Sequence, residues 1–191
     1  MLLGALAGAA FFAGCGSKAD DAAASAPPGA WKVDKANSRL EFAAEQTGKA
    51  FTGRFEDFEA TIVFDADNLD AARIEVSVAT GSARTGDRQR DDALPTADWF
   101  AAKEFPTATF IADKIVKTGE GAYAAEGALT LRGVSKPLTL PFTLAISGSR
   151  ATADGATSLI RTDFGVGQGE FATDEWVGFD VEVAFHIEAT R

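Results

Sequence analysis

The residues that could do chemistry are few in this chain of 191 residues. It contains one cysteine, Cys15, and one histidine, His186. A zinc site built from Cys and His needs several such ligands, and a Ser-His-Asp triad would have to use His186. A single cysteine also excludes an internal disulfide. We therefore expect no metal site and no required cofactor.

The remaining polar candidates are charged residues in two short segments: Arg90, Asp91 and Asp92 in one, Arg161 and Asp163 in the other. Their carboxylates could form part of an acid–base pair in a lipid-modifying enzyme, but no base or metal cluster accompanies them. They could also contact a ligand head group. We favour a structural role, as turn residues and ion pairs that hold a loop, because Asp and Arg are common in loops.

The aromatic composition indicates a dry interior. There are 15 Phe against 1 Tyr and 3 Trp. Phe has no polar atom, so it can line a surface that never meets water, although a packed core would use it equally well. The net charge of −10 argues against binding to nucleic acid and against electrostatic docking on anionic lipid.

The elements that position the side chains named above are strands, as the alternation of apolar and polar residues indicates. The pattern is clearest over residues 138–146 and 177–187 and recurs at 74–78. Long strands with one wet and one dry face are typical of antiparallel sheets. Pro141 would interrupt a ladder and predicts a bulge or an edge, and the parity of His186 predicts an outward side chain.

Two local features refine the strand pattern. Phe55 has one parity and Phe58 the other, so a bulge near Glu56-Asp57 would place both on one face. Asp154-Gly155 predicts a turn. We count about eight strands between residues 31 and 190, and we predict one or two short helices in the segment 85–106, which breaks the alternation.

Many strands and few helices leave a sandwich or a barrel. A strand of about 12 residues is about 40 Å long, and a tilt of about 40° gives a barrel about 30 Å tall. An eight-stranded barrel of this height is just wide enough for one slender apolar ligand. The residues that we predict to line it are Leu40, Phe42, Phe55, Ile62, Phe64, Ile74, Val76, Trp99, Phe100, Phe110, Leu129, Leu131, Leu140, Phe142, Leu144, Phe179, Val181 and Val183, with Trp99 and Phe100 as a cap on the insert.

The N-terminal residues resemble an export signal. Residues 1–14 are apolar and too short to span a bilayer, which is typical of a signal peptide. Cys15 follows in a context that resembles a bacterial lipoprotein cleavage site, although an ordinary signal with an incidental cysteine is the alternative. Residues 15–30 then read as a lipidated flexible tether, and residues 31–191 as one folded domain.

The segment from Trp31 to Glu188 resembles the YceI-like family of bacterial periplasmic polyisoprenoid-binding proteins. The resemblance rests on six motifs in the same order, of which residues 127–138, Gly-Ala-Leu-Thr-Leu-Arg-Gly-Val-Ser-Lys-Pro-Leu, are the most specific. It implies an all-β fold, an antiparallel eight-stranded lipocalin-like barrel with a short helical insert. It also implies a bound isoprenoid lipid or quinone.

Together these features predict a lipid carrier in the bacterial cell envelope, on the periplasmic side and anchored through Cys15, most simply to the outer membrane. We also consider a homodimer. The alternative functions are binding of a fatty acid or fatty amide, and an adaptor barrel with a solid core that binds proteins on its surface.

Overall fold

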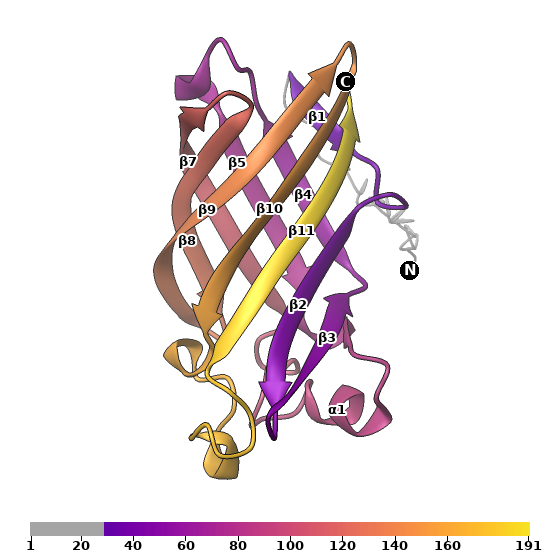
Figure 1. Ribbon diagram of the computed structural model, residues 1–191, viewed down its shortest axis with the longest axis vertical. Helices are drawn as coiled ribbons and strands as arrows, with labels where there is room; N and C mark the ends of the chain where they lie inside the picture. The colour runs from indigo at the N-terminus through magenta and orange to yellow at the C-terminus, as the bar shows by residue number, and fades with distance from the viewer. Residues whose placement is uncertain (1–28) are drawn as a thin grey trace, which may run out of the picture.

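The alternating pattern forms a closed barrel of antiparallel strands in the computed structural model, which describes residues 29–191 (Figure 1). The predicted signal peptide, Cys15 and most of the tether lie outside the described residues. The elements in chain order are β1 (Ala30–Val33), β2 (Arg39–Gln46), β3 (Lys49–Phe55), β4 (Phe58–Val63), η1 (Leu69–Ala71), β5 (Arg73–Ala79), η2 (Thr80–Ser82), β6 (Ala83–Arg84), α1 (Arg88–Ala93), β7 (Thr107–Gly119), β8 (Ala122–Leu131), β9 (Val134–Ser147), β10 (Arg150–Ile160), η3 (Arg161–Phe164), η4 (Gly169–Phe171) and β11 (Asp180–Thr190).

Eleven strand segments make eight barrel strands because three of the strands are interrupted. β1 and β2 both pair with β11, one after the other along its length. β3 and β4 likewise form one barrel strand, in which β3 pairs with β2 and β4 pairs with β1. β5 and β6 form the next barrel strand, in which β5 pairs with β4 and β6 pairs with β3. The pairing of β1 with β11 closes the ring. The prediction of an all-β, antiparallel eight-stranded barrel with a short helical insert is confirmed.

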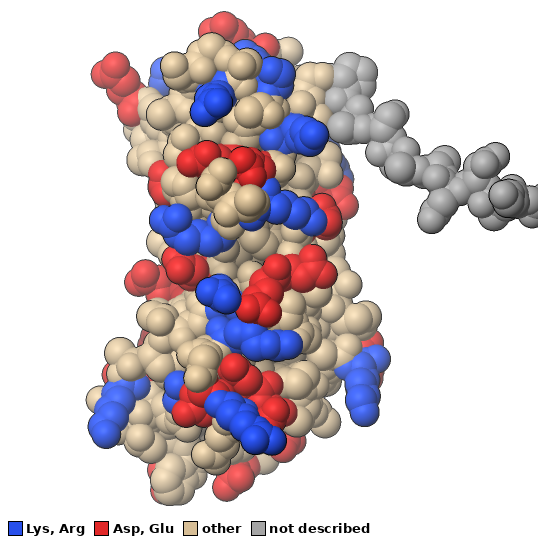
Figure 2. Space-filling view, turned by 90° about the vertical axis from the view of Figure 1, so that its right-hand side faces the viewer, with Lys and Arg blue, Asp and Glu red and all other residues tan. Residues whose placement is uncertain are grey.

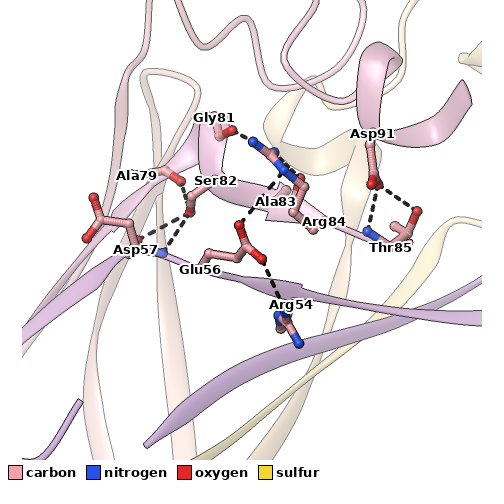
Figure 3. A network of polar contacts seen from close by, with 10 residues as sticks. All are labelled: Arg54, Glu56, Asp57, Ala79, Gly81, Ser82, Ala83, Arg84, Thr85 and Asp91. Atoms are coloured by element: carbon pink, nitrogen blue, oxygen red, sulfur yellow. Dashed lines mark hydrogen bonds and ion pairs between the residues drawn. The ribbon is translucent and has the colours of Figure 1, made fainter. Parts of the chain in front are cut away.

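The break between β3 and β4 lies at Glu56-Asp57, where the change of parity predicted a bulge. A polar network around the break holds it against η2 (Figure 3). The Ser82 hydroxyl lies 3.1 Å from the amide nitrogen of Asp57, which donates to it, and 2.7 Å from the Ala79 carbonyl. Phe55 and Phe58 consequently lie on the same, inner side of the barrel.

Two expectations about β9 and β10 have different outcomes. The turn predicted at Asp154-Gly155 is wrong, because both residues lie inside β10. Gly155 is there for close packing: a Cβ on it would lie 2.6 Å from the ring of Phe185. Pro141 lies within β9, and the ladder between β9 and β10 ends at the pair Phe142–Gly155, so the predicted interruption is confirmed.

One end of the barrel carries the insert between β6 and β7, with α1 and a series of turns (Figure 1). Asp87 caps α1 by accepting a hydrogen bond from the Arg90 amide at 3.1 Å. The long connection between β10 and β11, residues 161–179, lies at the same end. Within residues 29–191 we find no helix with the length and apolar character needed to cross a bilayer.

The outer surface carries charges of both signs, which alternate on the face that Figure 2 shows. Many form exposed pairs, such as Arg54 with Glu56 at 3.0 Å and Lys114 with Glu126 at 2.7 Å. His186 faces outward as predicted, with Nδ1 2.7 Å from an Asp154 carboxylate oxygen. Exposed pairs contribute at most about 1 kcal/mol each, so their main effect is to keep the outer surface wet.

Candidate ligand-binding cavity

The barrel encloses an apolar cavity of about 270 Å³. Its wall is made by the inner-face residues of all eight strands. Among the described lining residues the polar side chains are three threonines and one arginine, apart from the ring nitrogens of two tryptophans. The Thr80 hydroxyl donates to the Phe105 carbonyl at 2.7 Å, so it has no need of a ligand partner. The cavity therefore suits a hydrocarbon and penalises a polar occupant.

Two phenylalanines stay close to the wall because the neighbouring strand offers a glycine. Phe42 is in register with Gly53, and Phe185 with Gly155. A Cβ on Gly53 would lie 2.3 Å from the ring of Phe42, so the ring occupies the space that a side chain would need. The same holds for Phe185 and Gly155. These pairs keep large rings close to the wall, which leaves room in the lumen.

An aromatic plug closes the barrel end opposite α1. The rings of Phe64 and Tyr123 meet edge to face, with centroids 5.1 Å apart, and Tyr123 stacks on Phe142 at 5.6 Å. Trp31 donates its ring N–H to the Phe64 carbonyl at 3.0 Å and is itself buried. These rings form the centre of one hydrophobic cluster, so the cavity ends on solid packing here.

The other end is covered by the insert and the 161–179 connection, which we call the cap. Leu94 and Phe100 from the insert pack in one cluster with Phe164 and Val166 from the connection. The two segments are joined because the Asp98 carbonyl accepts hydrogen bonds from the amides of residues 167 and 168, both at 2.8 Å. No alternation marks these residues in the sequence, since they come from loops.

Arg161 holds the cap together from inside. The residue is 4% exposed, and its guanidinium donates to the carbonyls of Val166, Thr173, Val177 and Gly178 at 2.7–3.0 Å. Burial lowers the pKa of Arg161, an effect that the Asp174 carboxylate opposes. An arginine keeps its charge even so.

The close approach of this guanidinium depends on a glycine. A Cβ on Gly167 would lie 2.0 Å from an Arg161 terminal nitrogen, and Gly167 has φ of +81°. Arg161 also lies 5.7 Å from the ring centroid of Trp99. It is the one charged group among the described cavity-lining residues.

The other charged candidates make structural contacts and do not line the cavity themselves. Arg90 donates to the Gln46 side chain at 3.1 Å and lies over the ring of Phe51, which ties α1 to the β2–β3 turn. The Asp91 carboxylate accepts hydrogen bonds from the Thr85 amide at 2.6 Å and hydroxyl at 2.8 Å (Figure 3), which lower its pKa.

Two further carboxylates of the predicted set pair with cations. Asp92 is exposed and lies 3.6 Å from Arg88. Asp163 pairs with Lys136 at 3.0 Å. Neither residue contributes to the cavity wall.

The predicted lining residues are all on the cavity wall except Phe179. Its parity matches Val181, but β11 begins only at Asp180, so the alternation does not extend to residue 179. The Phe179 ring lies 5.6 Å from the Arg161 guanidinium instead. Whether the residues on the wall bind a ligand stays a prediction.

Sequence reasoning left out two kinds of lining residue. Parity would have found those that share the face of a residue that we named on the same strand. It would have missed Thr109, whose parity is opposite to that of Phe110, and the residues on β1 and β10, where we had named none. The cap residues have no such signal. The strand residues are Trp31, Ala44, Phe51, Phe58, Ala60, Val78, Ala108, Thr109, Leu138, Ala151, Ala153, Thr157, Leu159, Phe185, Ile187 and Ala189, and the residues outside the strands are Thr80 in η2 and Leu94, Phe164, Val166 and Val177 in the cap.

The fold and the cavity define the class: a lipocalin-like antiparallel barrel whose apolar interior is large enough for a ligand. Within the described part of the chain no group of three or more His, Cys, Asp or Glu side chains is placed to hold a metal ion. The chain belongs to the YceI-like domain family, which matches residues 31–189.

Individual relatives agree with this assignment. A UPF0312 protein of Pseudomonas putida strain W619 is 30% identical, with 80% of this chain and 84% of the relative covered. The crystal structure of Burkholderia cenocepacia BcnA superposes with a TM-score of 0.80 at 32% identity, over 83% of this chain and 100% of that one. A structure described as a polyisoprenoid binding domain from Saccharophagus degradans has a TM-score of 0.67 at 14% identity, over 85% of this chain and 98% of that one; this likeness concerns the fold alone.

Proposed function

We propose that the barrel binds one long apolar lipid tail, an isoprenoid chain such as that of a quinone or a polyprenyl lipid. The observation that carries this proposal is the cavity of about 270 Å³, whose wall offers a ligand almost no polar group. A water-sized group needs about 10–15 Å³ by this measure, so the cavity takes about twenty carbon-sized groups, or about four isoprene units. The Saccharophagus structure of similar fold is described as a polyisoprenoid binding domain, which makes an isoprenoid the first ligand to test.

Binding in such a cavity needs only the transfer of hydrocarbon out of water. Each buried methylene contributes about 0.8 kcal/mol, so a five-carbon isoprene unit contributes about 4 kcal/mol before ordering costs. The proposal therefore needs no catalytic residue and no cofactor. A fatty acid or a fatty amide would fill the same space and is the alternative ligand.

The cellular part of the proposal rests on the sequence. We propose that the protein carries its lipid in the bacterial cell envelope, on the periplasmic side, held at the outer membrane through Cys15. A homodimer is a further proposal. The solid-core adaptor is less favoured, because the interior is a cavity.

The first experiment is mass spectrometry of an organic extract of protein purified from its native membranes. We expect an isoprenoid lipid in about equimolar amount. A fatty acid or fatty amide in that amount would show that the alternative ligand is the right one. An empty extract would refute the lipid-carrier function.

The second experiment measures the affinity of delipidated protein for prenols of two to six isoprene units. We expect the affinity to rise with each unit up to about four and then to level off, because the cavity is full. Val76→Trp should lower the length at which the affinity levels off, because Val76 lies on the wall, whereas Ser77→Trp on the opposite face of β5 should not. An affinity that does not depend on tail length would contradict the proposal.

A further inference from the structure

The ladder between β9 and β10 covers only part of the two strands. It joins residues 142–147 of β9 to residues 150–155 of β10. β9 also includes residues 134–141 and β10 residues 156–160, yet no backbone pair joins these stretches. β9 stays paired with β8 and β10 with β11 throughout, and Figure 1 shows β9 and β10 diverging towards the capped end. We call this unpaired stretch the seam.

Two prolines explain why the seam does not pair. The Leu144 amide donates to the Gly121 carbonyl, on the β8 side of β9. Amides alternate in direction along a strand, so those of residues 137, 139 and 141 face β10. Residues 137 and 141 are prolines and have no N–H to donate. Opposite residues 156–160 of β10, this edge of β9 would offer three donors, and two of them are therefore missing.

The residues that border the seam on the inner face of the barrel, which we call its inner rim, are part of the cavity wall. Leu138 and Leu140 on β9, and Thr157 and Leu159 on β10, all line the cavity. A hydrocarbon chain in the seam would therefore be in contact with the cavity over the length of these residues.

The outer rim carries no charge, in contrast to the ion pairs elsewhere on the barrel. The outward residues of the two strands are Ser135, Pro137, Thr139, Pro141, Ala156, Ser158 and Ile160. At the capped end of the seam two apolar residues, Val134 and Ile160, are exposed, at 38% each. An apolar chain can pass this rim without removing a charge from water.

An ion pair crosses the seam near the cap. Lys136 is in register with Leu129, so it starts on the inner face of β9. Its ammonium reaches Asp163, which follows β10, at 3.0 Å, and lies 6.0 Å from the ring centroid of Phe164. Both side chains are partly exposed, so this pair is weak enough to open.

We propose that the seam is a side opening through which the lipid tail enters and leaves the barrel, with Lys136–Asp163 as its latch. The aromatic plug closes one end of the cavity and the cap closes the other, whereas the seam can widen without breaking a backbone hydrogen bond. The inference rests on the proposed function and specifies the route to that same cavity.

The test joins the two rims covalently. Extending the ladder register places Thr139 opposite Ser158, both facing outward. The variant carries Thr139→Cys and Ser158→Cys in a full chain with Cys15→Ser, and its thiols are joined by a cleavable bis-maleimide. The matched control carries Ala145→Cys and Thr152→Cys, which are paired on the same face of the same strands.

The measurement is stopped-flow quenching of tryptophan fluorescence by ubiquinone with a four-unit tail, supplied in phosphatidylcholine vesicles. Trp31 and Trp99 line the cavity and report its occupancy. We expect the joined seam to slow uptake at least tenfold, with recovery when the linker is cleaved, and no change in the joined control. Equal rates in both would overturn the side opening.

Two further variants test the same route without a linker. Pro137→Val with Pro141→Val restores both donors and should slow uptake. Lys136→Met should speed uptake about two- to fivefold, the range that the loss of an exposed ion pair can supply. The control Lys114→Met removes the exposed Lys114–Glu126 pair and should not change the rate of uptake. If the proline variant loads at the wild-type rate, the seam is not the route. If the wild-type protein takes up no quinone even at equilibrium, the proposed function itself has failed.

Discussion

Replacing Arg161 with methionine removes the donor that organises the cap. The guanidinium serves four backbone carbonyls at 2.7–3.0 Å, from residues 166, 173, 177 and 178, and its side chain is almost fully buried. Methionine is unbranched and apolar and ends about where the Arg161 Nε lies, so the substitution removes the guanidinium and its hydrogen bonds but keeps an apolar stem in the same place.

The expected cost follows from the carbonyls that lose their donor. A buried acceptor without a partner costs about 1–3 kcal/mol, and some of the four will turn towards water when the connection relaxes. We expect a loss of about 3–5 kcal/mol in the free energy of unfolding. For a domain of this size that corresponds to a fall in Tm of about 6–20 °C.

The assay is thermal unfolding of delipidated protein followed by circular dichroism, because a bound lipid would raise Tm by mass action. Arg161→Lys should recover only part of the loss, since an ammonium cannot reach all four carbonyls. Arg150→Met, at the other end of β10, removes an exposed arginine and should lower Tm very little. A fall of less than about 3 °C for Arg161→Met would refute the idea that this residue organises the cap.

Two further predictions concern single positions. Gly127→Ala should destabilise the barrel strongly, because its Cβ would lie 2.1 Å from the Ile111 carbonyl oxygen beside the bulge in β7, and chemical denaturation measures the loss. Asp91→Asn should remove a stabilisation that the wild type has above pH 3.8, the ordinary pKa of this carboxyl group. The wild type itself loses this stabilisation as the pH falls through the lowered pKa of Asp91 in the folded state. The measurement is the Tm of variant and wild type across this pH range.

Each of these has a matched control. A Cβ on Gly119 would meet only the Ala122 side chain, at 3.5 Å, so Gly119→Ala should cost much less than Gly127→Ala. Asp92→Asn removes a neighbouring carboxylate whose partner is the exposed Arg88, and it should change the Tm very little because an exposed ion pair contributes little stability. Equal effects of the two glycine variants, or of the two aspartate variants, would contradict the contacts on which the predictions rest.

The cavity wall could be predicted in large part because period-two alternation assigns a face to each residue of a long strand. Even the interruption at Glu56-Asp57 could be predicted. Phe55 and Phe58 have opposite parity, so both can face the barrel interior only if the strand is interrupted between them. The limit of parity is Phe179. It has the right parity, but it precedes β11, where the backbone is no longer held in a ladder.

The sequence by itself determined the fold class, the inner face of most strands and the apolar character of the cavity, because alternation and composition are local properties. Only the tertiary structure decided how the barrel is closed. The cap brings Leu94 against Phe164 and surrounds Arg161 with carbonyls, contacts between loops that have no periodicity. The seam likewise depends on the partner that each edge of β9 meets: Pro137 and Pro141 predict an interruption, but only the fold shows that it lies beside β10 and opens onto the cavity wall.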